Sequence, residues 1–560
     1  DQETPVIEQE AVFQNDRQKV EVSVVKKDAE TQATVPGTVF GLYAKEDILA
    51  HGEVLVKADT LISKALSDEN GKAVFMNDLP FGRYYIREEA APDGYVSSDK
   101  VVEVTAEYQG QEIPVVELAS EYENEPTKVS VKKTDLTTGV ELEGGKVINA
   151  TGKYVLPGFI DCHCHLRDPG LTQKEDFYTG TMAAAHSGIT MVCPQPNIKP
   201  VPNTLDAYLE EVKAGEEKAV VDFNPIGCPL GTPEDVKQIS DAGSAWFKLF
   251  EKVATYPYNT TAGTLDTHRI YEAFKAVAAT GKYCSVHPFD KYFFDAAVEK
   301  IKAEGKPLTL ENVRHLWYSD EEMTGAAYQL SYYAKKAGMK WYAMHAWMPG
   351  YIDLVRMLKE RGEMTIVSSF EYMPAMDASD EIYHIDSGKY IYLNHDAKPD
   401  RAKIWEAVRD GTIDMIGSDH APHAPEEYHP DDALHTGAGF AMLDYFGHLL
   451  VSHVNEGDLS LEKLVEVTSV NFAKTFGMYP RKGSNLPGTD ADFTIVDLNR
   501  EWEITEHDKV YTKTQTIPYV GRKMHGAVTN TVVRGRVVMT DGVVDGQAGW
   551  GKMITAGNSR

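Results

Sequence analysis

The chain has 560 residues, a charged fraction of 25% and a formal net charge of −29 at pH 7. This acidic balance argues against a nucleic-acid partner, which would require a basic face. No apolar run approaches the roughly 20 residues of a membrane helix, so we expect no membrane span. The five cysteines all follow residue 161 in an irregular pattern that is not a disulfide framework, which favours a reducing compartment for that part.

The sequence pattern of the N-terminal part is typical of an all-β module. Residues 1–19 are polar and rich in glutamine, and we interpret them as a flexible leader. Residues 20–126 contain short β-type runs separated by turn signals such as Pro92-Asp-Gly. This pattern, without a long amphipathic helix, favours a small β-sandwich.

An internal repeat begins after the sandwich and stops abruptly. The segment Val22-Ser-Val-Val-Lys-Lys-Asp28 recurs as Val129-Ser-Val-Lys-Lys-Thr-Asp135, and the similarity ends near Gly144. Residues 127–145 are therefore predicted to be the truncated start of a second sandwich repeat.

From Lys146 onward, predicted strands alternate with predicted helices. Strand 159–163 is followed by helix 175–187, and strand 189–193 is followed by helix 204–217. This alternation predicts βα units around a parallel sheet. We assign residues 146–475 to a (β/α)₈ barrel and residues 476–560 to a small C-terminal β portion with a tail.

Residues that bind metal ions recur where the predicted barrel strands end. His163 and His165 end one apolar strand at positions i and i+2, so their side chains share a face and can hold one ion together. Lys248, His287, His345 and Asp419 follow at the ends of four later strands. Each of these histidines alone is better explained as a hydrogen-bonded core or helix-cap histidine. The ordered set favours an active site, because barrel enzymes place their chemistry at these strand ends.

The sandwich resembles the prealbumin-like repeat domains of Gram-positive surface proteins, the CnaB type. The likeness lies in Gly37-Thr-Val-Phe-Gly-Leu-Tyr43, in Tyr84-Tyr-Ile-Arg-Glu88 and in Glu123-Asn124-Glu-Pro126. The resemblance implies an isopeptide bond between Lys26 and Asn124, with Glu88 as the proton shuttle. Burial would strip the lysine of its proton and make it a nucleophile. The alternative is a plain sandwich in which these three side chains are exposed.

The later part resembles the cyclic amidohydrolases of the amidohydrolase superfamily: dihydroorotase, hydantoinase and allantoinase. The resemblance covers roughly residues 146–545 and includes Val155-Leu-Pro-Gly-Phe-Ile-Asp-Cys-His163 and Ser418-Asp-His-Ala-Pro-His423. It implies two zinc ions bridged by carbamylated Lys248. The remaining roles that it implies are a first zinc site of His163, His165 and Asp419, a second of His287 and His345, and Asp419 as the general base.

Three further positions point to dihydroorotase, an enzyme of pyrimidine biosynthesis that converts dihydroorotate to N-carbamoyl-aspartate. In the resembling family Arg167, Asn197 and His423 would bind the substrate carboxylate, and Asn394 would also contact the substrate. A free carboxylate favours a guanidinium fork with amide and imidazole donors. The partner implied is a small cyclic ureide, and the alternative is a hydantoinase-like or allantoinase-like activity.

The sequence departs from the family at the presumed pocket and before the barrel. His345 is followed by Ala-Trp, Phe370-Glu-Tyr-Met-Pro stands where Thr-Pro-His-His is expected, and Gly437-Ala-Gly-Phe lacks a Glu-Thr pair. The truncated repeat stands where the family has a β segment. We therefore expect strands within residues 528–546 to lack partners and leave exposed edges.

These departures leave a second alternative open: a surface stalk or adhesin fragment carrying an inactive hydrolase. The two halves also imply different locations. The enzyme part suggests the cytoplasm, whereas the N-terminal module suggests a Gram-positive cell surface. The barrel could also form a homo-oligomer.

Overall fold

The computed structural model describes most of the chain in two compact units. One unit comprises Asp1–Ser130 with Val147–Tyr154, and the other comprises Val131–Lys146 with Val155–Arg560. Side chains are not described for residues 128–134 and 141–146. No helix in the described part is long and apolar enough to cross a membrane. The residues described are 18–556 except 51–52, 76–78, 93–94, 96, 111, 125–127, 135–140, 251–266, 310–311, 314–315, 317–318, 372–399, 428, 430, 433, 435–438, 440, 515–516 and 518.

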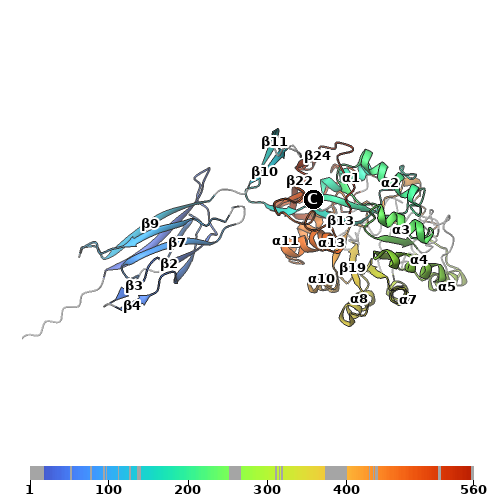
Figure 1. Cartoon of the computed structure of the whole chain (residues 1–560), viewed down its shortest axis with the longest axis horizontal. Helices are drawn as coiled ribbons and strands as arrows, with labels where there is room; N and C mark the ends of the chain where they lie inside the picture. The colour runs from blue at the N-terminus through green and yellow to red at the C-terminus, as the bar shows by residue number, and fades with distance from the viewer. Residues whose placement is uncertain are drawn as a thin grey trace, which may run out of the picture. The chain divides into compact units, whose positions relative to one another are not determined.

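The N-terminal unit is a β-sandwich built from two main sheets (Figure 1). In the first sheet, β1 (Lys19–Asp28) pairs in parallel with β9 (Val115–Asn124) and antiparallel with β6 (Lys72–Val74). The second sheet has the order β5-β2-β7-β8. Its strands are β5 (Leu61–Leu66), β2 (Val39–Ala44), β7 (Gly82–Ala90) and β8 (Val101–Ala106), and a small hairpin adds β3 (Ile48–Ala50) and β4 (Glu53–Val56).

The alternation of side chains along β1 determines what the sandwich buries. Val20, Val22 and Val24 are fully buried in the hydrophobic core. Because successive strand residues point to opposite faces, the next residue on the same face is Lys26. Its side chain is also fully buried, so the core of the sandwich contains an amine.

Strands β10 (Lys128–Thr134) and β11 (Glu141–Asn149) pair with each other in a two-stranded sheet. β10 lies within residues 127–145, which the sequence assigns to the truncated start of a second repeat.

The C-terminal unit contains, among the described residues, eight parallel strands in which each pairs with its neighbours in chain order. Three of them form the sheet β13-β14-β15 and five form the sheet β16-β17-β18-β19-β20. These strands are β13 (Phe159–Cys164), β14 (Ile189–Pro194), β15 (Asp222–Phe223), β16 (Phe247–Phe250), β17 (Tyr283–His287), β18 (Lys340–Ala343), β19 (Ile366–Glu371) and β20 (Met415–Gly417).

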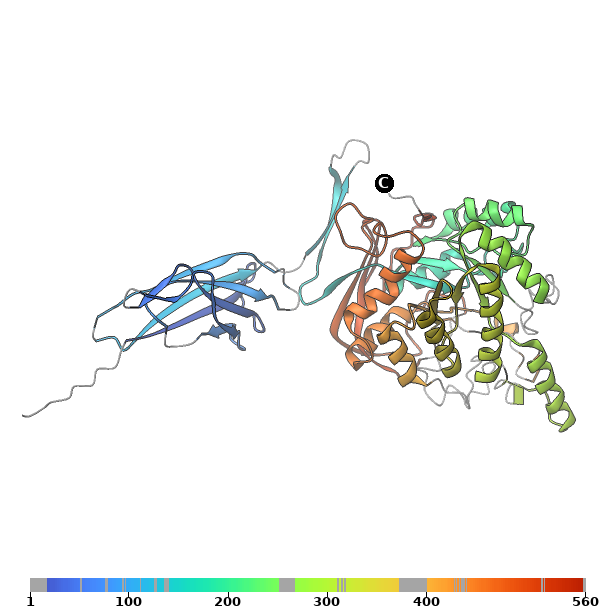
Figure 2. The same cartoon turned by 60° about the horizontal axis from the view of Figure 1, so that its bottom comes forward.

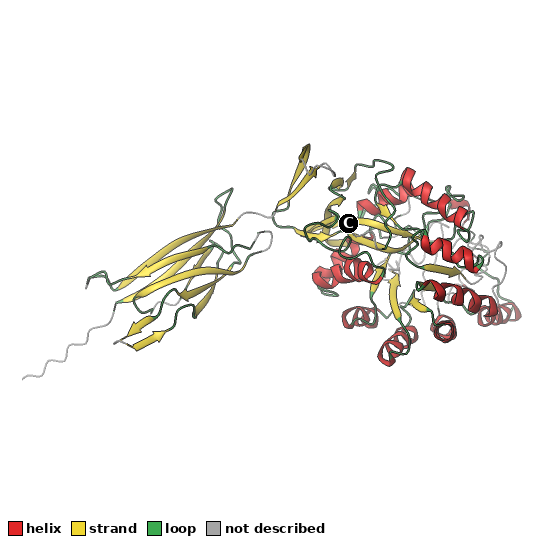
Figure 3. Ribbon diagram, in the orientation of Figure 1, coloured by secondary structure: helices red, strands yellow, loops and turns green. Residues whose placement is uncertain are grey.

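Two parallel bridges connect these sheets into the closed ring of a (β/α)₈ barrel. Gly227 bridges to Phe247, and Cys164 bridges to His420. Figure 3 shows the helices of this unit on the outside of its strands. The helices are α1 (Phe177–His186), α2 (Leu205–Lys218), α3 (Pro233–Asp241), α4 (Thr267–Thr280), α5 (Lys291–Ala303), α7 (Asp320–Ala337), α8 (Pro349–Arg361), α10 (Arg401–Asp410), α11 (Phe446–Glu456), α12 (Leu461–Val465) and α13 (Asn471–Thr475), with short turns η4 (Pro425–Glu427) and η5 (Glu466–Val470).

The C-terminal strands lie in a five-stranded sheet of order β12-β21-β22-β23-β24, and α11 packs on β22 (Figure 2). The expectation that strands within residues 528–546 lack partners is therefore wrong. Each of these strands pairs antiparallel with the next, and β12, which directly precedes the barrel, adds an edge beside β21. The strands are β12 (Tyr154–Pro157), β21 (Phe493–Glu503), β22 (Lys523–Val533), β23 (Arg536–Thr540) and β24 (Val543–Val544).

A buried ionic cluster joins the barrel to this sheet. Lys482 is almost fully buried, and its Nζ lies 2.6 Å from Asp222 of β15 and 2.5 Å from Asp492, which precedes β21. Asp490 lies 3.2 Å away, and Arg534 also pairs with Asp222. Because the carboxylates surround one ammonium, burial of these charges is compensated within the cluster.

Candidate active site and metal centre

Five of the six residues predicted as metal ligands lie at or just beyond the carboxyl ends of barrel strands, and Lys248 lies two residues before the end of its strand. His163 is the penultimate residue of β13, and His165 directly follows that strand. Lys248 lies in β16, and His287 is the last residue of β17. The two remaining residues follow the ends of β18 and β20, and they are His345 and Asp419. All six side chains therefore come from the end of the barrel where enzymes of this architecture keep their chemistry.

Three of these side chains direct ligand atoms to one point. Nε2 of His165 lies 3.1 Å from Oδ1 of Asp419, and Nε2 of His163 lies 3.4 Å from the same oxygen. The two Nε2 atoms are 3.3 Å apart. Two imidazoles and a carboxylate are a donor set that suits zinc, so the residues present fit a metal ion at this point.

The charges of these groups suit ligation at neutral pH. Burial, with the nearby Lys248 and His345, holds the pKa of His163 well below its usual range, so its ring is neutral. Burial alone would raise the pKa of Asp419, but its hydrogen bond with His165 and the charges of nearby His345 and Lys248 lower the value to about 2. Neutral imidazoles and an anionic carboxylate are the forms that bind metal.

Lys248 is fully buried beside this cluster. Its Nζ lies 2.6 Å from Sδ of Met344 and 5.3 Å from the ring centre of Phe250. Burial lowers the pKa of Lys248 to about 8 despite the opposing influence of Glu371 and Asp419. Burial, with the charges of His345 and Lys248 close by, holds the pKa of His287 well below its usual range. The ring centres of His287 and His345 are 4.7 Å apart, so the second pair of predicted ligands lies together.

Backbone strain is concentrated at this site. His345 and Asp419 have φ angles of 62° and 48°, and Arg167 has a φ of 61°. Left-handed conformations are unfavourable for residues with a Cβ atom, and they persist where the surrounding structure imposes them. Three predicted site residues have this conformation, which indicates that the backbone after the strands is held so as to orient their side chains.

The Nδ1 atoms of two of these imidazole rings also face partners. Nδ1–H of His165 donates to Oδ1 of Asn197 at 2.6 Å, so Asn197 orients a predicted metal ligand in addition to its predicted contact with substrate. Nδ1 of His345 lies 3.1 Å from Glu371, the last residue of β19. Glu371 was not predicted from the sequence as a functional residue, although it ends a barrel strand.

A group of charged residues lies near His165, whose pKa is lowered by burial and by the charge of Arg167. Arg167 is fully buried, and its Nε donates to the carbonyl of Pro422 at 3.3 Å. Nζ of Lys174 lies 2.6 Å from Glu427 and 3.5 Å from Nδ1 of His423. Burial, with Arg167 and Lys174 nearby, lowers the pKa of His423 to about 4 despite the hydrogen bond with Glu427. Lys174 and Glu427 were not predicted from the sequence. Asn394 lies outside the described residues.

The sandwich brings its own three predicted residues together. Nζ of Lys26 lies 2.8 Å from Oε2 of Glu88, and Nδ2 of Asn124 donates to the same oxygen at 2.7 Å. All three side chains are buried, which excludes the alternative of exposed side chains. Burial lowers the pKa of Lys26 despite the hydrogen bond to Glu88.

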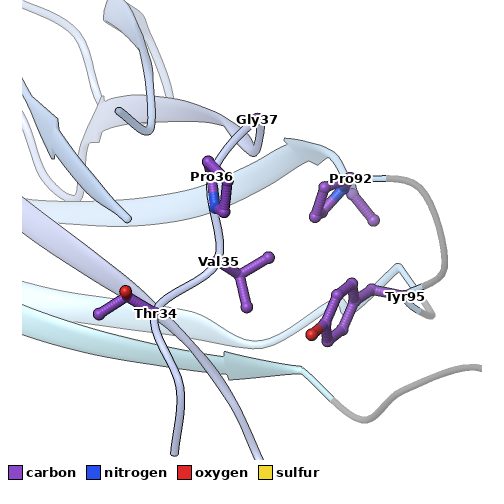
Figure 4. Close-up of a pocket in the computed structure, with 7 residues that line it drawn as sticks. Thr34, Val35, Pro36, Gly37, Pro92 and Tyr95 are labelled. Carbon is purple, nitrogen blue, oxygen red and sulfur yellow. The ribbon is translucent and has the colours of Figure 1, made fainter. Parts of the chain in front are cut away.

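The sandwich also carries a shallow groove of about 500 Å³ beside these residues. Val35, Pro92 and Tyr95 line it (Figure 4). The hydroxyl of Tyr95 donates to Asp28 at 2.9 Å. The described lining is mainly apolar and the phenol is already bonded, so we assign no catalytic role to the described residues of the groove.

Comparison with known families agrees with both units. Residues 154–538 match the amidohydrolase family, and residues 20–122 match the prealbumin-like fold domain. A dihydroorotase of Lactobacillus helveticus is 33% identical over 412 residues, which are 72% of this chain and 92% of that protein. An L-hydantoinase of Paenarthrobacter aurescens is 31% identical over 431 residues, covering 75% of this chain and 91% of that protein.

Solved structures of hydantoinases have a fold similar to that of this chain. The L-hydantoinase of Arthrobacter aurescens superposes with a TM-score of 0.65 at 26% identity, over 84% of this chain and 96% of that one. A D-hydantoinase of a Thermus species has a TM-score of 0.66 at 23% identity, covering 77% of this chain and 94% of that one, and shares the fold. The chain belongs to the amidohydrolase family. Its C-terminal unit is a cyclic amidohydrolase that carries a prealbumin-like domain before it.

Proposed function

We propose that the chain hydrolyses a six-membered cyclic ureide that bears a carboxylate, with dihydroorotate as the substrate and N-carbamoyl-aspartate as the product. The observation that carries this proposal is the convergence of His163, His165 and Asp419 on one point beside buried Lys248. Two zinc ions are proposed as the cofactor, the first held by these three residues and the second by His287 and His345. Such ions would polarise the scissile carbonyl and activate water.

Lys248 is proposed to bridge the two ions as a carbamate. A lysine ammonium cannot bind a metal, but its neutral amine can attack carbon dioxide. The nitrogen forms a bond to carbon, the amine releases one proton, and the product carries an anionic carboxylate. A pKa of about 8 makes the neutral amine accessible near neutral pH, which supports this role.

Asp419 is the proposed general base. Its pKa of about 2 keeps it ionised, and the hydrogen bond with His165 fixes its orientation. It would accept a proton from the attacking water and deliver it to the departing amide nitrogen. That transfer lets the ring open without expelling a nitrogen anion.

The proposed preference for a substrate with a carboxylate rests on the residues around His165. Asn197 is 3% exposed, and its Nδ2 has no hydrogen-bond partner among the described residues. A buried amide donor without a partner is unfavourable, so a substrate oxygen would satisfy it. Arg167 and His423 would supply the remaining donors. A hydantoinase-like activity on a ring without a carboxylate is the second candidate, favoured by the similarity to the L-hydantoinase.

The two candidates are separated by kcat/KM for dihydroorotate, dihydrouracil and hydantoin on the wild type and on Arg167→Ala. A charge-assisted hydrogen bond contributes about 1.5–3 kcal/mol, so the variant should lose about ten- to a hundredfold on dihydroorotate alone. Arg356→Ala is the control, because Arg356 pairs with Asp410 on the outer helices. Equal losses on all three rings would mean that Arg167 is structural and that the carboxylate assignment is wrong.

For the sandwich, we propose an isopeptide bond between Lys26 and Asn124. The lysine nitrogen would bond to the side-chain carbonyl carbon of the asparagine, and the amide nitrogen would leave as ammonia. Oε2 of Glu88 contacts both reacting groups, so this carboxyl group can carry the proton from one nitrogen to the other. The module would then act as a crosslinked structural domain, as in surface proteins.

A further inference from the structure

One buried carboxylate lies between two of the predicted metal ligands. Glu371 is fully buried at the carboxyl end of β19. Its Oε1 lies 3.5 Å from Nδ1 of His163, and its Oε2 lies 3.1 Å from Nδ1 of His345. Each oxygen therefore faces a different imidazole, and the two imidazoles belong to different proposed zinc sites.

The carboxylate is fixed independently of these rings. The hydroxyl of Ser369 donates to Oε1 at 2.5 Å, and the backbone N–H of His345 donates to Oε2. That N–H belongs to a residue with a φ of 62°, so the same contact helps to hold the strained backbone of the ligand. Glu371 is thus placed by its own strand and by the loop after β18.

We propose that Glu371 is a shared positioning residue that orients one ligand of each zinc site. A neutral imidazole carries one N–H, and a carboxylate facing Nδ1 keeps the proton there and leaves the Nε2 lone pair for a metal. This inference rests on the proposed two-zinc site. It couples the sites, because one side chain sets the tautomer and ring orientation in both.

Direct ligation by Glu371 explains the geometry less well. Nε2 of His163 is the atom that approaches Asp419, at 3.4 Å, whereas Glu371 lies on the Nδ1 side of that ring. The carboxylate therefore stands behind the ligand with respect to the point where the metal would be held. His165 has a different partner, because its Nδ1–H donates to Oδ1 of Asn197.

Because the histidines have different partners, the zinc affinities of variants at Asn197 and Glu371 can be compared with each other. Asn197 contacts a ligand of the first site alone, so Asn197→Ala should weaken one zinc ion. Glu371→Ala removes the carboxylate that faces both rings and should weaken both sites. Glu371→Gln keeps the shape of the side chain but has a single carbonyl oxygen, so only one ring retains its acceptor and one site should weaken.

The experiment titrates the full metal-free chain with zinc in competition with a chromogenic chelator, which resolves binding without reference to activity. Each affected site should bind about 10–100-fold more weakly, the usual effect of removing such a partner. Glu211→Gln is the control, because Glu211 on α2 is another fully buried carboxylate, and no described residue bonds to it. Its zinc affinities should equal those of the wild type.

Thermal unfolding of the metal-free variants checks that each is folded, and Glu371→Gln carries the test if Glu371→Ala does not fold. Wild-type affinity at both sites in folded Glu371 variants would overturn the inference. Weakening of a single site in folded Glu371→Ala would overturn it as well. A wild-type chain that binds fewer than two zinc ions would instead refute the proposed two-zinc site, so the two failures are distinguishable.

Discussion

The sandwich and the barrel each bury one lysine for which we propose a covalent reaction, and the two differ in what surrounds the amine. Lys26 lies 2.8 Å from a carboxylate and shares that carboxylate with an asparagine amide. Lys248 has a thioether and an aromatic ring as its nearest partners, and carboxylates influence it only from a distance. Burial lowers the pKa of both amines. In our proposal these surroundings determine which electrophile each amine attacks: an internal amide for Lys26 and dissolved carbon dioxide for Lys248.

Lys482 shows that burial alone does not make a lysine reactive. It is as deeply buried as the other two, but Asp222, Asp490 and Asp492 surround it. Burial by itself would lower its pKa, but these charges outweigh that effect and raise the value. Its amine stays protonated and serves as a structural cation between the barrel and the C-terminal sheet.

The largest effect is expected for Lys248→Ala. Removing the bridging group should release most of the metal and lower kcat/KM by at least about a thousandfold, or about 4 kcal/mol. Metal analysis of the purified protein and steady-state kinetics test both effects together. Full activity in a metal-free variant would refute the proposed metal centre. The proposed difference between Lys248 and Lys26 in the electrophile that each amine attacks would then also be wrong.

Lys482→Met should affect folding and leave the chemistry of Lys248 unchanged. Without the ammonium, Asp222 and Asp492 remain buried together, and breaking such a pair costs about 3–5 kcal/mol. The free energy of unfolding of the C-terminal unit should fall by that amount in a denaturant titration of the full chain. Lys463→Met, which removes a surface pair with Glu466, is the control. An unchanged free energy of unfolding would show that the ammonium of Lys482 does not offset the cost of burying Asp222 and Asp492.

Glu88→Gln tests the reactivity of Lys26. The wild-type chain should have an intact mass lower by one ammonia, and the variant should have the unmodified mass. A crosslink that closes a loop of this size is expected to stabilise the sandwich by about 2–4 kcal/mol, which the variant should lose. Glu89→Gln is a matched control, because Glu89 lies on the other face of β7 and binds Tyr43 and Arg87. Unmodified mass in folded wild-type protein would make the module a plain sandwich.

The sequence predicted the barrel and most of its strands because short apolar runs and helix-sized intervals alternate from residue 159 onward. The ordered ligand residues followed from the rule that barrel strands end at the active site. Glu371 was missed because a carboxylate behind an imidazole leaves no spacing signal of its own. The pairing of β12 with β21 was also missed, since nothing in Tyr154–Pro157 indicates a partner more than three hundred residues away.

The smallest effect concerns the pH at which Lys248 becomes reactive. Because burial lowers the pKa of this amine to about 8, its neutral form becomes abundant above about pH 8 and declines below it. Metal-free chain supplied with zinc and a constant concentration of dissolved carbon dioxide should regain activity about fiftyfold faster at pH 8 than at pH 6. His163 and His165 do not explain such a profile, since burial holds the pKa of His163 well below its usual range and that of His165 at about 4. A rate of recovery that is flat from pH 6 to 8 would mean that deprotonation of Lys248 is not the step that pH controls. The two reactive lysines would then differ in more than their electrophiles.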